Sequence, residues 1–385
     1  MLAFTGRCSY LSSPPISLTF LNVIITTRNL VQYLLAKQFV CSESVVDGDF
    51  TVIEVSGRNR NFKVLRSNGP SYFVKQIRHF DPQTVAMLQC EAACYWLARN
   101  DNDFASLLPL TPEFYSYDPE RQIIITELIT TGEDLWSHFR RARTIKAEVT
   151  AELGSLLGTY HSTTGHELKE SPQSKIFPQN IPWILSPERR NSHPFKRLSP
   201  ATTELFDRVE RSAELSSALD ELRDNWQAST LMHGDLKLEN CILSGNGYNS
   251  NFDFTIIDWE SADIGDPCWD IGSILQSFIS VRIISLPPTE VRLSFRDVLT
   301  HPLHAGLSES ILSFWEHYVV KLALDAQASH KLLERCVRYG GARMIQSAYE
   351  YMQFSPHLSS NALHLLEVSQ DLLKDTGAAV EQLRN

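Results

Sequence analysis

One short run of the sequence pairs a carboxylate with a carboxamide at a spacing suited to phosphoryl transfer. Within LMHGDLKLENCIL (residues 231–243), Asp235 is followed five positions later by Asn240. A carboxylate at the first position orients an attacking hydroxyl, and an amide oxygen one short turn later binds a magnesium ion on the nucleotide. Asp235 is therefore the candidate catalytic residue, and Asn240 is a candidate metal ligand.

A second run supplies another oxygen ligand. The apolar strand pattern at residues 254–257 ends at Asp258, so the Asp258 carboxylate projects from a strand end, where a hard cation can bridge it to phosphates. The turn-rich residues 244–247 favour a hairpin that brings Asp258 close to Asp235 and Asn240. The alternative is an ordinary turn in which the His-Gly-Asp side chains satisfy backbone groups. The pairing of the two runs weighs against that alternative.

These runs resemble the catalytic and metal motifs of the aminoglycoside phosphotransferase and choline kinase-like family, relatives of the eukaryotic protein kinases. The continuation GDPCWDIG (residues 265–272) is similar to the family's Gly-Asp-Pro-x-x-Asp-hydrophobic-small run. The resemblance covers residues 50–275 best. It implies ATP and Mg²⁺ as cofactors and a hydroxyl-bearing acceptor. It also implies that Asp270 braces the catalytic loop from a buried helix start, which is a structural role.

Composition is compatible with an enzyme. The 385 residues, of which 43% are hydrophobic, suffice for a large core. The formal net charge of −10 argues against nucleic acid or an anionic membrane surface as the main partner. The seven cysteines are odd in number and lack a Cys-x-x-Cys pair, which indicates neither a disulfide framework nor a zinc site. We therefore expect a cytoplasmic protein.

The first residues carry no targeting signal that we recognise. The apolar patch at residues 16–25 is discontinuous, unlike a secretory signal, and too short to span a bilayer. We expect residues 1–15 to be a disordered extension, and residues 28–37 to form a short packing helix without chemistry.

From residue 50 the pattern becomes that of β-strands. Runs at residues 50–55, 62–65 and 72–77 are separated by turns rich in Gly, Asn and Ser, and they predict an antiparallel meander. The resemblance implies that the first turn lies over the nucleotide phosphates, which makes Gly57 a candidate contact. The alternative is an ordinary hairpin glycine.

Lys75 interrupts the third apolar strand, so its side chain either points to solvent or turns into a cleft to meet an anion. The following helix begins at Asp81 and Pro82, a cap and a first-turn proline, and carries an apolar face. Glu91 borders that face, where a carboxylate needs a cation. We predict a Lys75–Glu91 ion pair. The resemblance implies that this lysine binds and orients the ATP phosphates.

A second hairpin, with strands at residues 113–117 and 122–126, leads to a break at residues 130–132. We expect the small lobe to end, and the large lobe to begin, at this break. The resemblance implies that backbone groups at the hinge pair with adenine, and we assign this role to Glu127 and Ile129.

The C-terminal half has a helical pattern. A helix at residues 148–161 ends in His161, which resembles the histidine of the family's Leu-x-x-Leu-His run or is a satisfied core histidine. The other helices are expected at residues 205–210, 215–226, 311–326, 331–338, 342–352 and 363–373.

The resemblance implies that the insert at residues 162–226 and the helices after Asp270 shape the acceptor pocket. Arg343, Tyr349 and Glu350 are candidate acceptor contacts only by position, and we favour the interpretation that they belong to a solvent-exposed helix face.

We predict an α+β, bilobal protein kinase-like fold. Residues 1–49 form an extension with a short helix, residues 50–130 a small lobe with an antiparallel sheet, and residues 131–385 a large, mainly helical lobe. ATP lies between the lobes, and the γ-phosphoryl group moves to a hydroxyl.

The identity of the acceptor is the open question. Gly234, in place of an arginine, follows the small-molecule members of the family, and the acidic composition favours an amine-bearing acceptor. Lys237, two positions after Asp235, is a second candidate catalytic residue. Protein serine/threonine kinases have a lysine there that reaches the γ-phosphate, although lysine is also common on exposed loops. We predict a small-molecule acceptor. A peptide or protein kinase is the alternative, and a nucleotide-binding pseudoenzyme is a further one.

Overall fold

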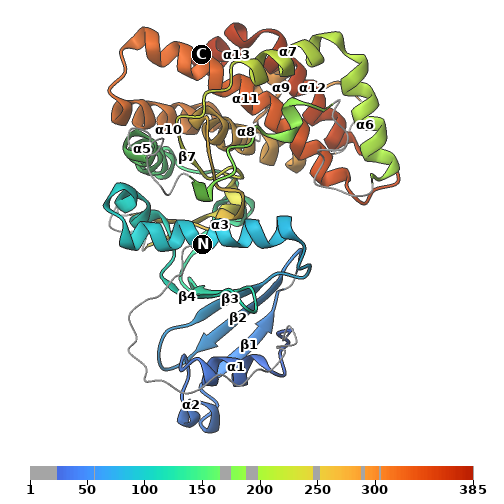
Figure 1. Cartoon of the computed structure of the whole chain (residues 1–385). Helices are drawn as coiled ribbons and strands as arrows, with labels where there is room; N and C mark the ends of the chain where they lie inside the picture. The colour runs from blue at the N-terminus through green and yellow to red at the C-terminus, as the bar shows by residue number, and fades with distance from the viewer. Residues whose placement is uncertain are drawn as a thin grey trace.

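The computed structural model describes residues 24–55, 57–164, 175–187, 198–245, 252–287, 291–302 and 305–384. The predicted extension at residues 1–15 and half of the predicted turn at residues 244–247 lie outside the described residues. The chain folds into two lobes, one built on a β-sheet and one almost entirely helical (Figure 1). None of the described helices is long and apolar enough to cross a membrane.

The small lobe is a five-stranded antiparallel sheet in the order β1-β2-β3-β5-β4. Its strands are β1 (Phe50–Glu54), β2 (Arg60–Arg66), β3 (Tyr72–Gln76), β4 (Phe114–Asp118) and β5 (Ile123–Glu127). The predicted meander and second hairpin are therefore confirmed. In the register of the sheet, Lys75 lies opposite Asn61 of β2 and Ile124 of β5, so the lysine occupies the middle strand.

Alternation along the strands gives the sheet two faces. Val64, Val74 and Ile125 point to one face, where they share a core with α1 (Leu30–Ala36). The predicted short helix is therefore confirmed, and α2 (Ser42–Val46) follows it. Because side chains alternate, Lys75 points to the opposite face.

Helix α3 (Pro82–Asn100) lies between the sheet and the large lobe (Figure 1). The Asp81 side chain accepts a hydrogen bond from the Thr84 backbone at 3.1 Å, and Pro82 occupies the first turn. This is the start that the sequence predicts. Glu91 is buried on this helix, so α3 delivers a carboxylate toward Lys75.

The large lobe begins with β6 (Glu133–Asp134), α4 (Leu135–Ala142) and α5 (Ala147–Thr164). Short strands carry the candidate site: β7 (Thr230–Met232), β8 (Cys241–Ser244), β9 (Asp253–Ile256) and β10 (Asp263–Gly265). The remaining helices are α6 (Pro200–Arg211), α7 (Ala213–Asp224), α8 (Pro267–Ser285), α9 (Phe295–Thr300), α10 (Leu307–Leu322), α11 (Ala326–Met352), α12 (Ser360–Lys374) and α13 (Thr376–Arg384). The helical large lobe confirms the predicted fold class.

Helix α11 corrects one prediction, because the two helices expected at residues 331–338 and 342–352 are one continuous helix. Gly340 lies against Gly272 of α8. A Cβ on Gly272 would come within 2.6 Å of the Gly340 nitrogen. The glycines therefore allow close helix packing and do not end the helix.

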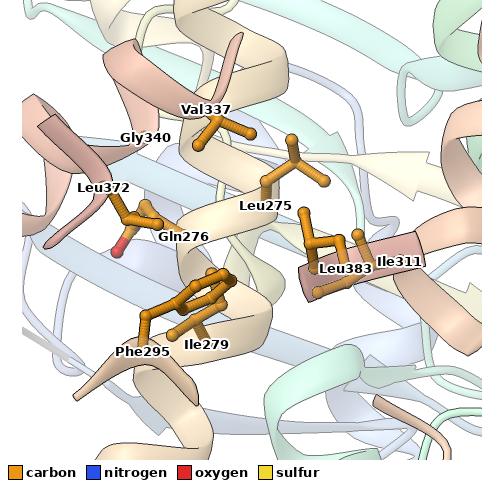
Figure 2. Close-up of a pocket in the computed structure, with 9 residues that line it drawn as sticks. All are labelled: Leu275, Gln276, Ile279, Phe295, Ile311, Val337, Gly340, Leu372 and Leu383. Atoms are coloured by element: carbon orange, nitrogen blue, oxygen red, sulfur yellow. The ribbon is translucent and has the colours of Figure 1, made fainter. Parts of the chain in front are cut away.

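The helical core is closely packed. A cavity of about 10 Å³ lies among α8, α9, α10, α11, α12 and α13. Figure 2 shows the side chains that line it, most of them apolar, such as Leu275, Phe295 and Val337. It has room for at most about one water molecule, so it is not a substrate site.

Gly154→Ala is expected to destabilise the protein although alanine favours a helix. A Cβ at this position would lie 2.2 Å from the Phe314 carbonyl oxygen of α10, and such overpacking costs about 1–3 kcal/mol. The free energy of unfolding, measured with urea, checks the prediction. Gly377→Ala on α13 is the control, because the nearest atom is an Asp375 oxygen at 3.8 Å. Equal stability of the two variants would contradict the packing argument.

Candidate active site

The two sequence runs form adjoining loops of the large lobe. Strands β8 and β9 pair antiparallel, with Cys241 opposite Ile256, so Asn240 and Asp258 flank one end of the hairpin. The Ile257 backbone N–H donates to the Asn240 carbonyl at 3.0 Å. The predicted hairpin is therefore confirmed.

The side chain of Asp270 fixes the loop that carries Asp235. This fully buried carboxylate in the first turn of α8 accepts the backbone N–H groups of His233 at 2.6 Å and Gly234 at 2.9 Å. Gly234 has φ +80°, and a Cβ there would lie 2.2 Å from the Ser261 carbonyl oxygen, so the turn requires glycine. The arrangement agrees with the structural role that we expected for Asp270.

His161 lies beside the Asp270 carboxylate. Its Nε2 lies 3.5 Å from an Asp270 oxygen, and its Nδ1 lies 3.0 Å from the Tyr318 hydroxyl. The ring is buried. His161 therefore acts as a core histidine beneath the catalytic loop.

The Asp235 carboxylate is held between two cations. Arg343 Nη2 donates to Oδ1 at 2.6 Å, and Lys237 Nζ donates to Oδ2 at 2.7 Å. Burial acts to raise the Asp235 pKa, but the charges of Lys237 and Arg343 outweigh burial and lower the pKa to about 2. Asp235 is therefore a carboxylate at neutral pH.

The prediction that Arg343 lies on a solvent-exposed helix face is wrong. Its side chain is 1% exposed, and it bonds to Glu350 at 3.3 Å as well as to Asp235. Tyr349 is also buried, with its ring 4.8 Å from that of Phe206. Neither side chain faces solvent, because α11 packs against α8 and α6.

Lys75 forms the predicted ion pair with Glu91, at 2.8 Å. Its ammonium also contacts Asp258 at 2.5 Å and Glu260 at 2.8 Å. Burial raises the pKa of Glu91 to about 7 against the opposing charge of Lys75. For Lys75, the carboxylates of Asp258, Glu91 and Glu260 outweigh burial and raise the pKa well above its ordinary value. One ammonium thus lies among three carboxylates.

Glu260 is a site residue that our sequence reasoning missed. Besides Lys75, it accepts hydrogen bonds from Arg58 at 3.0 Å and Asn59 at 3.2 Å. It therefore ties the β1–β2 turn to the large lobe. The available signal was a second carboxylate two positions after Asp258.

Gly57 lies in that turn, and a Cβ on it would meet nothing within 4 Å. Glycine is therefore not sterically required there, and its phosphate contact stays a prediction. At the hinge, the backbone N–H of Glu127 donates to Glu113 at 2.8 Å and that of Leu128 donates to Ser71 at 2.9 Å. The adenine contacts of Glu127 and Ile129 also stay predictions.

The residues around Lys75 suit a hard divalent cation. Ligand atoms of Glu91, Asp258 and Glu260 lie within 4.8 Å of one another, and carboxylate oxygens are the donors that such cations prefer. Among the described residues, these three carboxylates also outnumber the two cations that contact them, Lys75 and Arg58. The donor set therefore fits a hard divalent cation.

A cavity of about 120 Å³ lies beside the two cations that contact Asp235. Its lining includes the two cations that hold Asp235, two carboxylates and two aromatic rings: Lys237, Arg343, Glu239, Glu350, Trp136 and Tyr351. These residues come from α4, from Lys237 and the 3₁₀ turn Leu238–Asn240 that follows it, and from α11. None of the described residues of the insert (162–226) lines this cavity, and the role of the insert in shaping the acceptor pocket stays a prediction.

Solved structures of kinases share the fold. An ethanolamine kinase of Plasmodium vivax has a TM-score of 0.54 and 14% identity, covering 94% of this chain and 91% of that one. A choline kinase from Cryptosporidium parvum Iowa II has a TM-score of 0.55 and 14% identity, covering 93% and 100%. The amicoumacin kinase hAmiN, in complex with AMP-PNP, Ca²⁺ and Ami, has a TM-score of 0.50 and 14% identity, covering 89% and 95%. At this identity the likeness establishes the fold, which is the bilobal kinase-like fold that we predicted.

No curated protein matches the sequence significantly. The sequence model of the phosphotransferase enzyme family APH matches residues 49–290. That match is more than half of the chain and spans Lys75, the catalytic loop and Asp258. It confirms the resemblance that the motifs indicate. The chain therefore belongs to the APH phosphotransferase enzyme family and is a kinase that acts on a hydroxyl acceptor.

Proposed function

We propose that this protein transfers the γ-phosphoryl group of ATP, in the presence of Mg²⁺, to a hydroxyl of a small amine-bearing molecule. The observation that carries the proposal is the position of Asp235. It belongs to the braced catalytic loop, and both of its cationic partners line the 120 Å³ cavity. A hydroxyl bound in that cavity would lie beside the two cations that contact the Asp235 carboxylate. A cytoplasmic location and the absence of a nucleic-acid partner remain predictions from composition.

In the proposed reaction the acceptor oxygen attacks the γ-phosphorus in line with the leaving group. The bond between the γ-phosphorus and the β–γ bridging oxygen breaks, and its electron pair remains on ADP. The hydroxyl proton passes to Asp235 and then to solvent. Because its pKa is about 2, Asp235 serves chiefly to orient the hydroxyl and takes the proton late.

Asp258 and Asn240 would hold Mg²⁺, with Glu260 and Glu91 as neighbouring carboxylates. The metal, when bound, neutralises charge on the β- and γ-phosphates. Lys75 now contacts Asp258 at 2.5 Å, and we propose that its ammonium turns from Asp258 to the ATP phosphates while Glu91 retains it. Arg58 would be released from Glu260 in the same step, because its side chain is exposed and can follow the phosphates.

An amine on the acceptor is supported by the carboxylates of the cavity. Glu239 forms no ion pair within the described part of the chain, and burial raises its pKa. Trp136 and Tyr351 line the same cavity, and aromatic faces attract cations. Two of the fold neighbours are named as ethanolamine and choline kinases, and both names denote hydroxylated amines.

The test is a screen with γ-labelled ATP against amino alcohols, amino sugars, neutral sugars and peptides. We expect label in the amino alcohols or amino sugars. Label only in the peptides would establish the protein kinase alternative instead. Label in no acceptor, with MgATP binding shown by calorimetry, would indicate a nucleotide-binding pseudoenzyme.

Glu239→Gln is expected to raise the KM for an amine-bearing acceptor about tenfold, as the loss of a charged hydrogen bond predicts. The value of kcat should change little, because Glu239 acts on binding and not on the transition state. Steady-state kinetics with an amino alcohol measure the change, and a neutral sugar acceptor serves as the matched control. An unchanged KM for the amine would show that the amine binds elsewhere.

A further inference from the structure

We infer that Arg343 is a positioning residue for phosphoryl transfer. It holds Oδ1 of Asp235, so that Oδ2 is the oxygen that receives the acceptor hydroxyl. The inference rests on the proposed function, since that function gives Asp235 its role.

The two oxygens of Asp235 have different kinds of partner. Arg343 is 1% exposed, and its Nη1 bonds to Ser347 at 3.4 Å and Glu350 at 3.3 Å on the same helix. The Lys237 side chain is 30% exposed, and within the described residues it bonds to Oδ2 alone. Arg343 is therefore fixed to α11, whereas Lys237 has room to move.

An aspartate carboxylate rotates easily about its last bond. The backbone bonds from His233 and Gly234 to Asp270 fix the loop, but they do not fix the carboxylate plane of Asp235. A guanidinium fixed to another element can do so. Arg343 reaches Asp235 from α11, across 108 residues of sequence, so the long helix and the catalytic loop set the carboxylate together.

This arrangement assigns separate roles to the two cations. If Lys237 turns toward the γ-phosphate, as the lysine at this position does in protein serine/threonine kinases, Oδ2 loses its partner and becomes free for the hydroxyl. Arg343 remains on Oδ1. The catalytic aspartate therefore keeps its orientation during the exchange.

The test compares Arg343→Met with Arg282→Met. Arg282 is an equally buried arginine on α8, 1% exposed, whose guanidinium lies 4.3 Å from the centre of the Phe139 ring and does not bond to Asp235 in the described structure. R343M is expected to lower kcat about 10- to 100-fold, the cost of a misplaced catalytic group. The KM values for MgATP and acceptor should change little. Arg343→Lys should recover part of kcat, and R282M should keep the wild-type kcat.

A merely structural role would lower the stability of R343M and R282M alike without separating their kcat values. An acceptor-binding role would raise the acceptor KM instead of lowering kcat. Either result overturns the inference. If R343M does not fold, Arg343→Gln is tested instead. A wild-type kcat in R343Q would overturn the inference.

The double variant D235N/R343M gives a second test. If Arg343 acts only through Asp235, adding R343M to D235N leaves the residual kcat unchanged. If R343M lowers the kcat of D235N by the same factor as it lowers that of the wild type, Arg343 has an independent role and the inference is overturned. A wild-type protein that phosphorylates no acceptor would refute the proposed function itself. An active wild type with R343M equal to R282M refutes only the inference.

Discussion

Asp235→Asn is expected to lower kcat about 10²- to 10⁴-fold, the typical contribution of a group that handles the acceptor proton, and to leave MgATP affinity close to that of the wild type. The amide has the same shape but carries no charge and cannot accept the proton. The groups that we propose to bind the nucleotide are separate, because Lys75 lies on β3 of the small lobe and is held there by Glu91 at 2.8 Å.

Turnover with the best acceptor from the screen, and calorimetry with a non-hydrolysable ATP analogue, measure the two quantities. Asp224→Asn, an exposed change at the end of α7, is the control for a lost carboxylate. A D235N enzyme that keeps more than about a hundredth of the wild-type kcat would remove Asp235 from the catalytic role.

Local patterns allowed the central elements of the site to be predicted. Asp235, Asn240 and Asp258 belong to two short runs joined by one hairpin, so spacing and turn chemistry were enough to bring them together. The Lys75–Glu91 pair also followed from local pattern, because a lysine in an apolar strand and a glutamate beside a buried helix face each lack a partner in their own element.

Contacts between distant elements were not predictable in this way. Arg343 lies on a helix 108 residues after Asp235, and nothing in the periodicity of that helix says which loop it faces. The sequence did hold a partial signal, since Arg343, Ser347 and Glu350 are spaced to share one helix face. We assigned Arg343, Tyr349 and Glu350 to a solvent-exposed face, whereas packing of α11 against α8 and α6 buries Arg343 and Tyr349 and leaves Glu350 partly exposed.

The glycines of α11 show the same limit. We expected two helices separated at residues 339–341, where Gly340 and Gly341 lie, and glycine disfavours helix interiors. The structure places Gly340 against Gly272 of α8, where a side chain on Gly272 would clash with the backbone of α11. Tertiary packing therefore outweighed local propensity, and only the packing partner could reveal it.

Asp258→Ala is expected to weaken MgATP binding at least tenfold. Loss of a supporting partner of a metal ligand typically costs about 10- to 100-fold in affinity, and here a charged ligand itself is lost. The same variant should bind metal-free ATP no more weakly than the wild type, because it removes a negative charge that repels the phosphates and frees Lys75, now 2.5 Å from Asp258.

Calorimetric titrations with MgATP and with ATP in excess chelator therefore separate two roles for Asp258. As a metal ligand, Asp258→Ala lowers the first affinity and spares the second. If Asp258 is only a partner of Lys75, Asp258→Ala leaves MgATP binding at the wild-type level. That result would overturn the assignment of Asp258 as a metal ligand. Asp258 itself has φ 68° and ψ 52°, a left-handed conformation that is uncommon for a non-glycine residue. Alanine tolerates this conformation less well than aspartate, so the comparison requires variants whose thermal unfolding confirms a folded protein.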